Sequence, residues 1–246
     1  MLFDLSLFLG MLLLLEVGRR IAQKRGGAPS GAGVVDGAVF ALLGLLIAFT
    51  FSAAASRFDT RRQLVVEEAN AIGTAYLRLD MLPQSVQPAL RESFRHYVDA
   101  RLAVYRKLPD LQAAKEELAR ATALQGEIWS QAVAACRTDA PPSAAILLLP
   151  ALNEMIDITT VRTVAARTHA PVPIFAILAA LALVASLLAG HGMAGTSTRS
   201  WLHMLAFAAA MAMTLYVILD LEFPRLGLIR LDTFDNVLVE VRESMK

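Results

Sequence analysis

Apolar residues in this chain fall into long runs, and between two of these runs they recur instead at helical spacing. The most extended feature starts at Val34 as an apolar run and continues, with no proline, to Pro83. In its polar second half, Val65, Ala69 and Ile72 recur at intervals of four and three residues, which is typical of an amphipathic helix. The apolar half is long enough to cross a hydrocarbon core of ~30 Å. We predict one helix, or two nearly collinear helices, that cross a bilayer and continue into water until Pro83.

Three further apolar runs predict three more membrane spans, over residues 2–17, 172–189 and 201–221. The segment between the second and third spans is amphipathic and punctuated by proline and aspartate, which predicts water-facing helices over 85–107, 110–136 and 143–170. Ser85 is a candidate N-cap for the first of these, and Pro150 is expected to bend the last. No stretch alternates with period two for long enough to form a sheet, so the prediction is an all-α integral membrane protein.

The expected organisation is four transmembrane helices with a helical extramembrane domain inserted between the second and third spans. The predicted parts are residues 1–56 for the first two spans, 57–170 for the extramembrane domain, 171–222 for the last two spans, and 223–246 for a tail that docks as a short helix. Basic residues near the span ends are almost evenly divided between the two sides. The positive-inside rule therefore leaves the orientation open.

Composition narrows the class of protein. The mean hydropathy is +0.53 and 56% of the residues are hydrophobic, which is too apolar for an ordinary soluble domain. The charged 18% are concentrated outside the apolar runs, as in a membrane protein with a sizeable water-facing part. A net charge of +1 gives no basic field for nucleic acid, and the single cysteine, Cys136, excludes an intrachain disulfide.

Residues that could carry chemistry have simpler structural explanations. His96 and Asp99 follow Glu92 at helical spacing, as metal ligands could, but the interleaved arginines favour a solvated or salt-bridged helix surface. The same interpretation applies to Glu154 and Asp157. The motifs of nucleotide-binding, zinc-protease and serine-hydrolase sites do not occur in the sequence. We therefore expect no enzyme, no metal site and no cofactor.

The predicted spans carry no charged residue near their centres. Their ionisable residues lie toward the ends, at Asp4, Glu16, Asp36 and Asp220. Ion-coupled transporters need ionisable groups or broken helices at mid-membrane depth, which disfavours a coupled transporter. A passive channel remains compatible with the sequence, because an apolar constriction can gate a pore by dewetting.

The second span has two different faces. Bulky apolar side chains form one stripe, made of Phe40, Leu43, Ile47 and Phe51. Small residues form a helix-packing ridge, made of Gly44, Ala48, Ser52 and Ala55. Such a ridge lets a neighbouring helix approach closely. The bulky stripe faces lipid, packs against protein or lines a pore, and spacing alone leaves these alternatives open.

A charged cluster follows the second span directly, and it is where the chain resembles a known family. The block LLGLLIAFTFSAAASRFDTRRQLVVEEANAIGTAYLRLDMLP resembles the bestrophin-like domain family of bacterial membrane proteins. A weaker similarity extends to PRLGLIRLD in the tail, so the resemblance covers most of the chain. More remotely, an apolar span, an arginine–aromatic–acid–arginine cluster and a long polar helix, in that order, are similar to the bestrophin ion channels.

The resemblance implies a homo-oligomeric ion channel. Bestrophin channels are pentamers in which the second span lines a central pore with a narrow hydrophobic neck and continues into a cytosolic helical domain. Ile47 and Phe51 match the neck best, with Phe40 and Leu43 on the same face. A charged collar below the neck would comprise Arg57, Asp59, Arg61 and Arg62.

Two departures from the channel pattern limit what the resemblance implies. Phe58 stands alone where the channels have paired aromatic residues. The tail offers only Asp232 and Asp235 where eukaryotic members have an acidic calcium clasp, so calcium activation is not implied.

Two hypotheses follow. The first is a bestrophin-like channel, multi-pass in the bacterial inner membrane, whose partners are its own copies, the lipid bilayer and inorganic ions. The alternative is a non-conducting membrane scaffold or sensor whose helical domain binds a partner. The lack of a polar selectivity element in the spans favours the alternative, and current across a planar bilayer separates the two.

Overall fold

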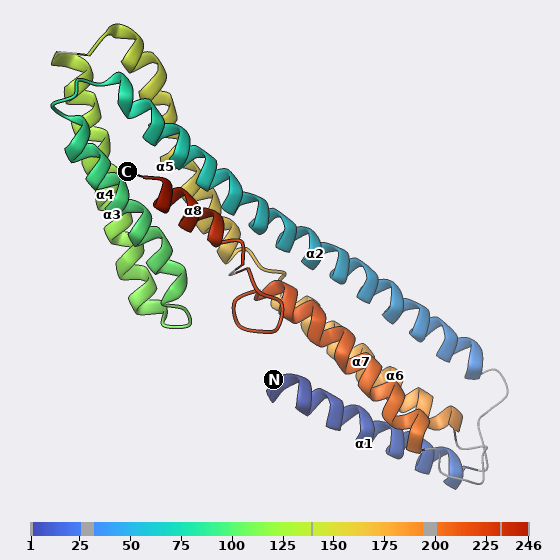
Figure 1. The fold of residues 1–246 in the computed structure, drawn as a ribbon. Coiled ribbons are helices and arrows are strands. Elements are labelled where there is room, and N and C mark those ends of the chain that lie inside the picture. The colour runs from blue at the N-terminus through green and yellow to red at the C-terminus, as the bar shows by residue number, and fades with distance from the viewer. Residues whose placement is uncertain (1, 26–31, 139, 194–200, 232, 246) are drawn as a thin grey trace. The chain divides into compact units, whose positions relative to one another are not determined.

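The structure is a computed structural model that describes residues 2–25, 32–138, 140–193, 201–231 and 233–245 (Figure 1). Every regular element in these ranges is a helix, as the periodicity predicts. The elements are α1 (Leu2–Lys24), α2 (Ala32–Arg78), the 3₁₀ turn η1 (Leu79–Met81), α3 (Gln87–Arg106), α4 (Leu111–Thr138), α5 (Pro142–Arg167), α6 (Val172–Gly192), α7 (Trp201–Glu222) and α8 (Asn236–Ser244).

The helix starts agree with the sequence at some positions and correct it at others. α2 is one helix of 47 residues, as predicted for the stretch before Pro83. The carboxylate of Asp110 caps α4 by accepting hydrogen bonds from the backbone N–H groups of Gln112 (3.1 Å) and Ala113 (3.0 Å). Ser85 is not the cap of α3. The helix starts later, with Pro88 in its first turn, where a missing N–H needs no partner.

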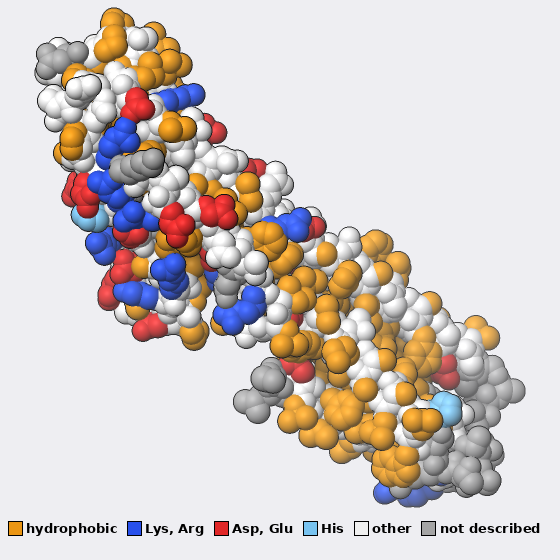
Figure 2. Space-filling model, viewed as in Figure 1, with side chains coloured by type: hydrophobic (Ala, Val, Ile, Leu, Met, Phe, Trp, Pro, Cys, Tyr) orange, Lys and Arg blue, Asp and Glu red, His pale blue; other side chains and the backbone are white. Residues whose placement is uncertain are grey.

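The chain divides into two compact units. Unit 1 comprises Met1–Arg57 and His169–Phe223, and unit 2 comprises Phe58–Thr168 and Pro224–Lys246. α2 contributes its apolar first part to unit 1 and its amphipathic second part to unit 2. Figure 2 shows hydrophobic side chains over most of the visible surface of unit 1, whereas unit 2 displays charged side chains of both signs.

Two glycines bring α1 and α6 of unit 1 into backbone contact. A Cβ atom added to Gly18 would overlap the carbonyl oxygen of Leu187, and one added to Gly190 would overlap the carbonyl oxygen of Leu15. Only a residue without a side chain fits at either position. Close approach through small residues is the usual way in which helices associate in a membrane. This contact therefore organises unit 1.

Three helical segments among the described residues are long and apolar enough to cross a membrane, judged by length and composition. They are Gly33–Met81, Pro142–Gly192 and Trp201–Glu222. The predicted first span forms a helix, α1, but is not among them, because Asp4, Glu16 and Arg19 interrupt its apolar run. The four-span topology stays a prediction.

The core of unit 2 is formed by the second part of α2 with α3, α4, α5 and α8. Phe94 of α3, Ile128 of α4 and Leu148 of α5 are fully buried in one apolar cluster. Leu238 of α8 is fully buried in the same cluster, so the tail docks as the short helix that the sequence predicts. Burying a leucine side chain in this way contributes about 1.5–3 kcal/mol.

Candidate functional site

The apolar part of α2 has one side packed inside unit 1 and one side that the other described residues leave uncovered. On the packed side, Leu43 is 1% exposed. Phe40 meets Phe207 of α7 edge to face, with 6.3 Å between the ring centroids. On the uncovered side, Leu45 is 53% exposed and Phe49 is 65% exposed. α2 therefore presents an apolar face for contacts outside the single chain.

The four residues predicted to form a pore neck do not share one environment. Leu43 is buried within the chain, and Phe40 and Ile47 are half-buried. Phe51 is 44% exposed, at the border between the packed and the uncovered sides. Their role in a pore stays a prediction. Of the four, Phe51 has the most side-chain surface available to another molecule or to solvent.

The small residues predicted as a helix-packing ridge lie mostly on the uncovered side. Gly44, Ala48 and Ser52 are exposed, and Ala55 is half-buried. A Cβ atom on Gly44 would meet no atom within 4 Å. Three of its four residues are thus left uncovered by the described part of the chain. It borders Leu45 and Phe49, so the uncovered face combines a shallow strip with two bulky apolar side chains.

The predicted charged collar separates into three different contacts. Arg57 donates from Nε to Glu222 at the end of α7 (2.7 Å), and Glu222 is fully buried. Arg61 donates to the carbonyl oxygens of Ala165 (3.1 Å) and Thr168 (2.7 Å), which caps the C-terminal end of α5.

The remaining two residues of the predicted collar, Asp59 and Arg62, form an exposed pair at 3.3 Å. Exposed pairs of this kind contribute little to stability. Arg62 also lies over the ring of Phe234, 5.4 Å from its centroid. Arg57 and Arg61 thus hold helix ends, and Asp59 and Arg62 remain at the surface.

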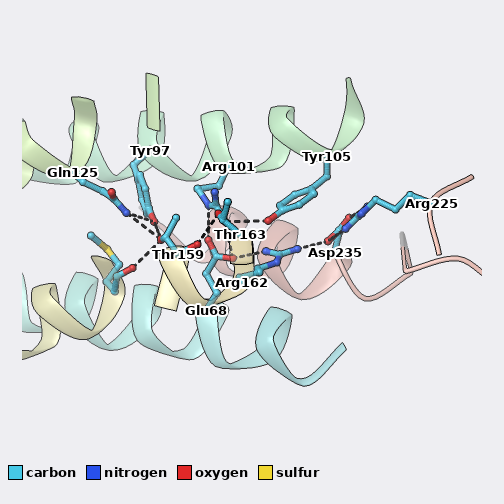
Figure 3. A network of polar contacts seen from close by, with 11 residues as sticks. Glu68, Tyr97, Arg101, Tyr105, Gln125, Thr159, Arg162, Thr163, Arg225 and Asp235 are labelled. Carbon is cyan, nitrogen blue, oxygen red and sulfur yellow. Dashed lines mark hydrogen bonds and ion pairs between the residues drawn. The ribbon is translucent and has the colours of Figure 1, made fainter. Parts of the chain in front are cut away.

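A buried ion network joins helices of unit 2 (Figure 3). Glu68 of α2 accepts hydrogen bonds from Arg101 of α3, at 2.5 Å from Nε and 3.1 Å from Nη2. It also binds Arg162 of α5. Glu68 and Arg101 are fully buried. Burial alone would lower the pKa of Arg101, but Tyr105 and Glu68 outweigh it and hold the pKa above its ordinary range.

The network continues through Tyr105 to the tail. The guanidinium carbons of Arg162 and Arg225 lie 4.1 Å and 4.4 Å from the centroid of the Tyr105 ring. Both arginines also donate to Asp235, at 2.9 Å and 2.8 Å. Cation–π contacts and charge-assisted hydrogen bonds therefore join α2, α3, α5 and the start of α8.

A second polar cluster lies beside the ion network in Figure 3. The hydroxyls of Tyr97 and Thr159 are 3.0 Å apart, and the amide of Gln125 donates to both, at 3.2 Å and 3.0 Å. Burial raises the pKa of Tyr97 to about 12. Since the side chains of this cluster bond one another, they tie α3, α4 and α5 together without leaving these polar groups unsatisfied.

The surface with His96 is salt-bridged, as expected. Glu92 pairs with Arg95 (2.6 Å) and His96 (3.1 Å), and Asp99 pairs with Arg242 of α8 (2.8 Å). In the part of the chain that the structure describes, no three His, Cys, Asp or Glu residues gather as metal ligands would. Asp232 lies outside the described residues.

Sequence reasoning missed Glu68, although its position carries a signal. Glu68 falls three residues after Val65 and four before Ile72, on the apolar face of the helix. A carboxylate on such a face needs buried partners. One of these partners is Arg162 of α5, which pairs with both Glu68 and Asp235.

Comparison with known proteins gives one family. The model of the family described as bestrophin-like domain matches residues 5–233. A crystal structure of a bacterial bestrophin homologue from Klebsiella pneumoniae is similar at 16% identity, with a TM-score of 0.69 over 99% of this chain and 97% of that one. A single-residue variant of it, also 16% identical, has a TM-score of 0.73 over 99% of each chain. No curated protein matches the chain.

Proposed function

The chain belongs to the bestrophin-like family, and from this premise we propose that it forms an ion channel from several copies of itself, with α2 of each copy at the pore. The observation that supports the proposal most is the uncovered apolar face of α2, with Leu45 and Phe49 exposed beside open space at Gly44. If several copies form a ring with α2 near the centre, one flank of this face contacts α2 of the neighbouring copy and the other flank lines the central axis.

We propose that the neck is formed by side chains on this uncovered face. Leu45 and Phe49 are four residues apart and therefore lie on the same side of the helix. Rings of such side chains narrow a pore to an apolar constriction. Phe51, with Ile47, is the alternative neck that the family resemblance implies. Leu43 is the weakest candidate, since contacts inside its own chain bury it.

The ridge of Gly44, Ala48 and Ser52 suits the contact between neighbouring α2 helices. Small side chains let helices approach closely in a membrane, and this strip is open in the single chain. In the proposed channel, Asp59 and Arg62 keep a charged surface just beyond the apolar part of α2. Arg57 and Arg61 hold helix ends there.

Planar bilayer recordings of the purified protein test the proposal. We expect single-channel currents, and we expect Phe49→Ala to raise the conductance because it widens an apolar constriction. Phe51→Ala tests the alternative neck. Leu13→Ala on α1 is the matched control, because Leu13 is equally exposed and apolar but lies on another helix. Reversal potentials in salt gradients then give the ion preference.

Two results would overturn the channel proposal. One is a strictly monomeric particle mass in detergent, since one chain cannot surround an axis. The other is the absence of current in the wild type and in both phenylalanine variants under every ionic condition. The second result, with an oligomer present, would support the non-conducting scaffold or sensor.

We also propose that unit 2 lies in the cytoplasm and that the protein resides in the bacterial inner membrane. The family resemblance supports this orientation, because the helical domain of bestrophin channels is cytosolic. A reporter that works only in the cytoplasm should therefore be active when it is fused after the last residue. If only a reporter that works outside the cytoplasm is active at that position, the orientation is the reverse.

A further inference from the structure

α1 is packed inside unit 1 along one side, and the other described residues leave its opposite side uncovered. On the packed side, Leu15 is fully buried, and a Cβ atom on Gly18 would overlap the backbone of α6. On the uncovered side, Leu5, Leu9 and Leu13 follow one another at intervals of four residues, and each is more than half exposed. This side of α1 therefore presents a row of apolar side chains to its surroundings.

The same side of α1 becomes basic toward the end of the helix. Arg20 and Lys24 each come 11 residues after a leucine of the row, Leu9 and Leu13, and 11 residues are close to three full helical turns. The side chain of Arg20 is 69% exposed, although it pairs with Glu16 at 2.7 Å, and Lys24 is exposed. We call these five residues, Leu5, Leu9, Leu13, Arg20 and Lys24, the outer stripe of α1.

Positive charge is in excess at the C-terminal end of the outer stripe. Residues 14–25 contain four basic residues (Arg19, Arg20, Lys24 and Arg25) and one acidic residue, Glu16. The next acidic residue along the chain is Asp36, near the start of α2. Figure 2 shows Lys and Arg side chains at one end of the apolar surface of unit 1. An anion at this end would compensate part of the excess charge.

The contact with α6 indicates the depth of the outer stripe in a membrane. Gly18 lies against the backbone at Leu187, close to the end of α6, and α6 contains no Asp, Glu, Lys or Arg. The apolar part of the stripe therefore runs beside an apolar helix, whereas Arg20 and Lys24 come where that helix ends. α7 starts after a short connection with Trp201, which is 52% exposed. Tryptophan is enriched at the level of the lipid headgroups.

We propose that the outer stripe binds an anionic phospholipid, with an acyl chain along the leucines and the phosphate at Arg20 and Lys24. The guanidinium group offers paired N–H donors to phosphate oxygens, and the ammonium group adds a second positive charge. The long stems of both side chains reach the headgroup level from a helix that lies in hydrocarbon. A zwitterionic lipid fits less well, because its own cationic group meets the same excess of positive charge.

The proposal is tested on the full-length protein in neutral detergent, with equal amounts of phosphatidylglycerol and phosphatidylcholine that have the same acyl chains. Gel filtration removes unbound lipid, and mass spectrometry quantifies both lipids that stay with the protein. We expect phosphatidylglycerol to be enriched, and the enrichment to fall as the ionic strength rises. In the variant Arg20→Gln with Lys24→Gln the enrichment should fall on the order of tenfold or more, since each basic residue near anionic headgroups contributes roughly fivefold.

Two matched variants separate the outer stripe from general charge. Lys115→Gln with Arg137→Gln removes one exposed lysine and one exposed arginine from α4 of unit 2, and it should retain the enrichment of the wild type. Arg20→Lys with Lys24→Arg keeps both charges of the stripe and should also retain it. Soluble glycerol phosphate has the anionic group without acyl chains, and it should not displace the lipid.

The substituted side chains are exposed, so the midpoint of thermal unfolding in detergent alone should be the same in every variant. If the double glutamine variant does not fold, Lys24→Gln alone should still lower the enrichment by roughly fivefold.

Three results would overturn the proposal. The first is equal retention of the two lipids by the wild type, which is also the result expected if a second copy of the chain covers the stripe. The second is the same enrichment in the wild type and in the glutamine variants. The third is displacement of the lipid by glycerol phosphate. All three are measured without current, so this surface and the proposed channel stand or fall separately.

Discussion

Glu68 and Arg101 form an ion pair in which carboxylate oxygen and guanidinium Nε are 2.5 Å apart and neither side chain is exposed. The partners lie on α2 and α3 and are 33 residues apart in the sequence. A buried pair gains little over apolar packing, but removing one partner leaves an uncompensated charge. The pair therefore penalises any arrangement that separates these two helices.

Removal of one partner should be severe. We expect Arg101→Met to lower the free energy of unfolding by at most about 3–5 kcal/mol, because Arg162 is then the one partner that Glu68 keeps among the described residues in a buried site. Chemical denaturation in detergent measures the change. Arg62→Met is the control: its exposed pair with Asp59 should be worth about 0–1 kcal/mol. Equal losses in the two variants would contradict a special role for the buried pair.

The Tyr97 hydroxyl should make stability fall at alkaline pH. Its pKa is about 12 in the folded chain, against ~10 for an unfolded tyrosine. Burial thus favours the neutral hydroxyl in the folded state. Its contribution is complete below pH ~10 and is lost as the pH rises toward ~12, with a total of about 2–3 kcal/mol.

The variant Tyr97→Phe isolates this effect, since other alkaline titrations are common to both proteins. At pH 8 the variant should be less stable than the wild type, because it loses the hydrogen bonds with Thr159 and Gln125. The difference should narrow as the pH rises above ~10. A difference that stays constant up to pH 11 would show that Tyr97 does not titrate as its burial implies.

The open strip at Gly44 should control assembly. Gly44→Leu adds a bulky side chain to the ridge, where the proposed neighbouring α2 helix packs, and should lower the oligomeric mass measured in detergent. Gly126→Leu is matched to it: Gly126 is also an exposed helical glycine with open space around it, but it lies on α4 and not on the ridge. An unchanged mass for Gly44→Leu would remove the ridge from the subunit contact.

The helices could be predicted from the sequence because local chemistry sets them. Pro83 follows the end of the α2–η1 segment, and Asp110 directly precedes α4, as expected. Val65, Ala69 and Ile72, whose spacing predicts a helix, are all buried on one side of α2. Ser85 failed as a cap because Pro88 determined where α3 starts. Neighbouring residues can each favour a different first residue for a helix, so the start of a helix is predicted less exactly than its existence.

The tertiary partners could not be predicted, because nothing local encodes them. The pattern of α2 gives two faces, but it does not indicate that Phe40 packs against Phe207 of α7. Likewise, Glu68 stands out on an apolar face, while its partners Arg101 and Arg162 come from two other helices. A charged residue at an apolar position predicts that partners exist and leaves their identity open.

Some glycines of this chain lie where no side chain fits, and others have open space around them. A survey of tolerated substitutions should distinguish the two kinds of position. At Gly18 and Gly190 even alanine places a carbon onto backbone of the opposite helix, which cannot move aside as a flexible side chain does. Gly33 and Gly37 have empty space around them. In a library of single substitutions selected for folded protein, the first two positions should accept almost nothing, whereas the other two should accept most residues. The residues tolerated at each position would thus identify where α1 and α6 are in backbone contact, independently of a structure.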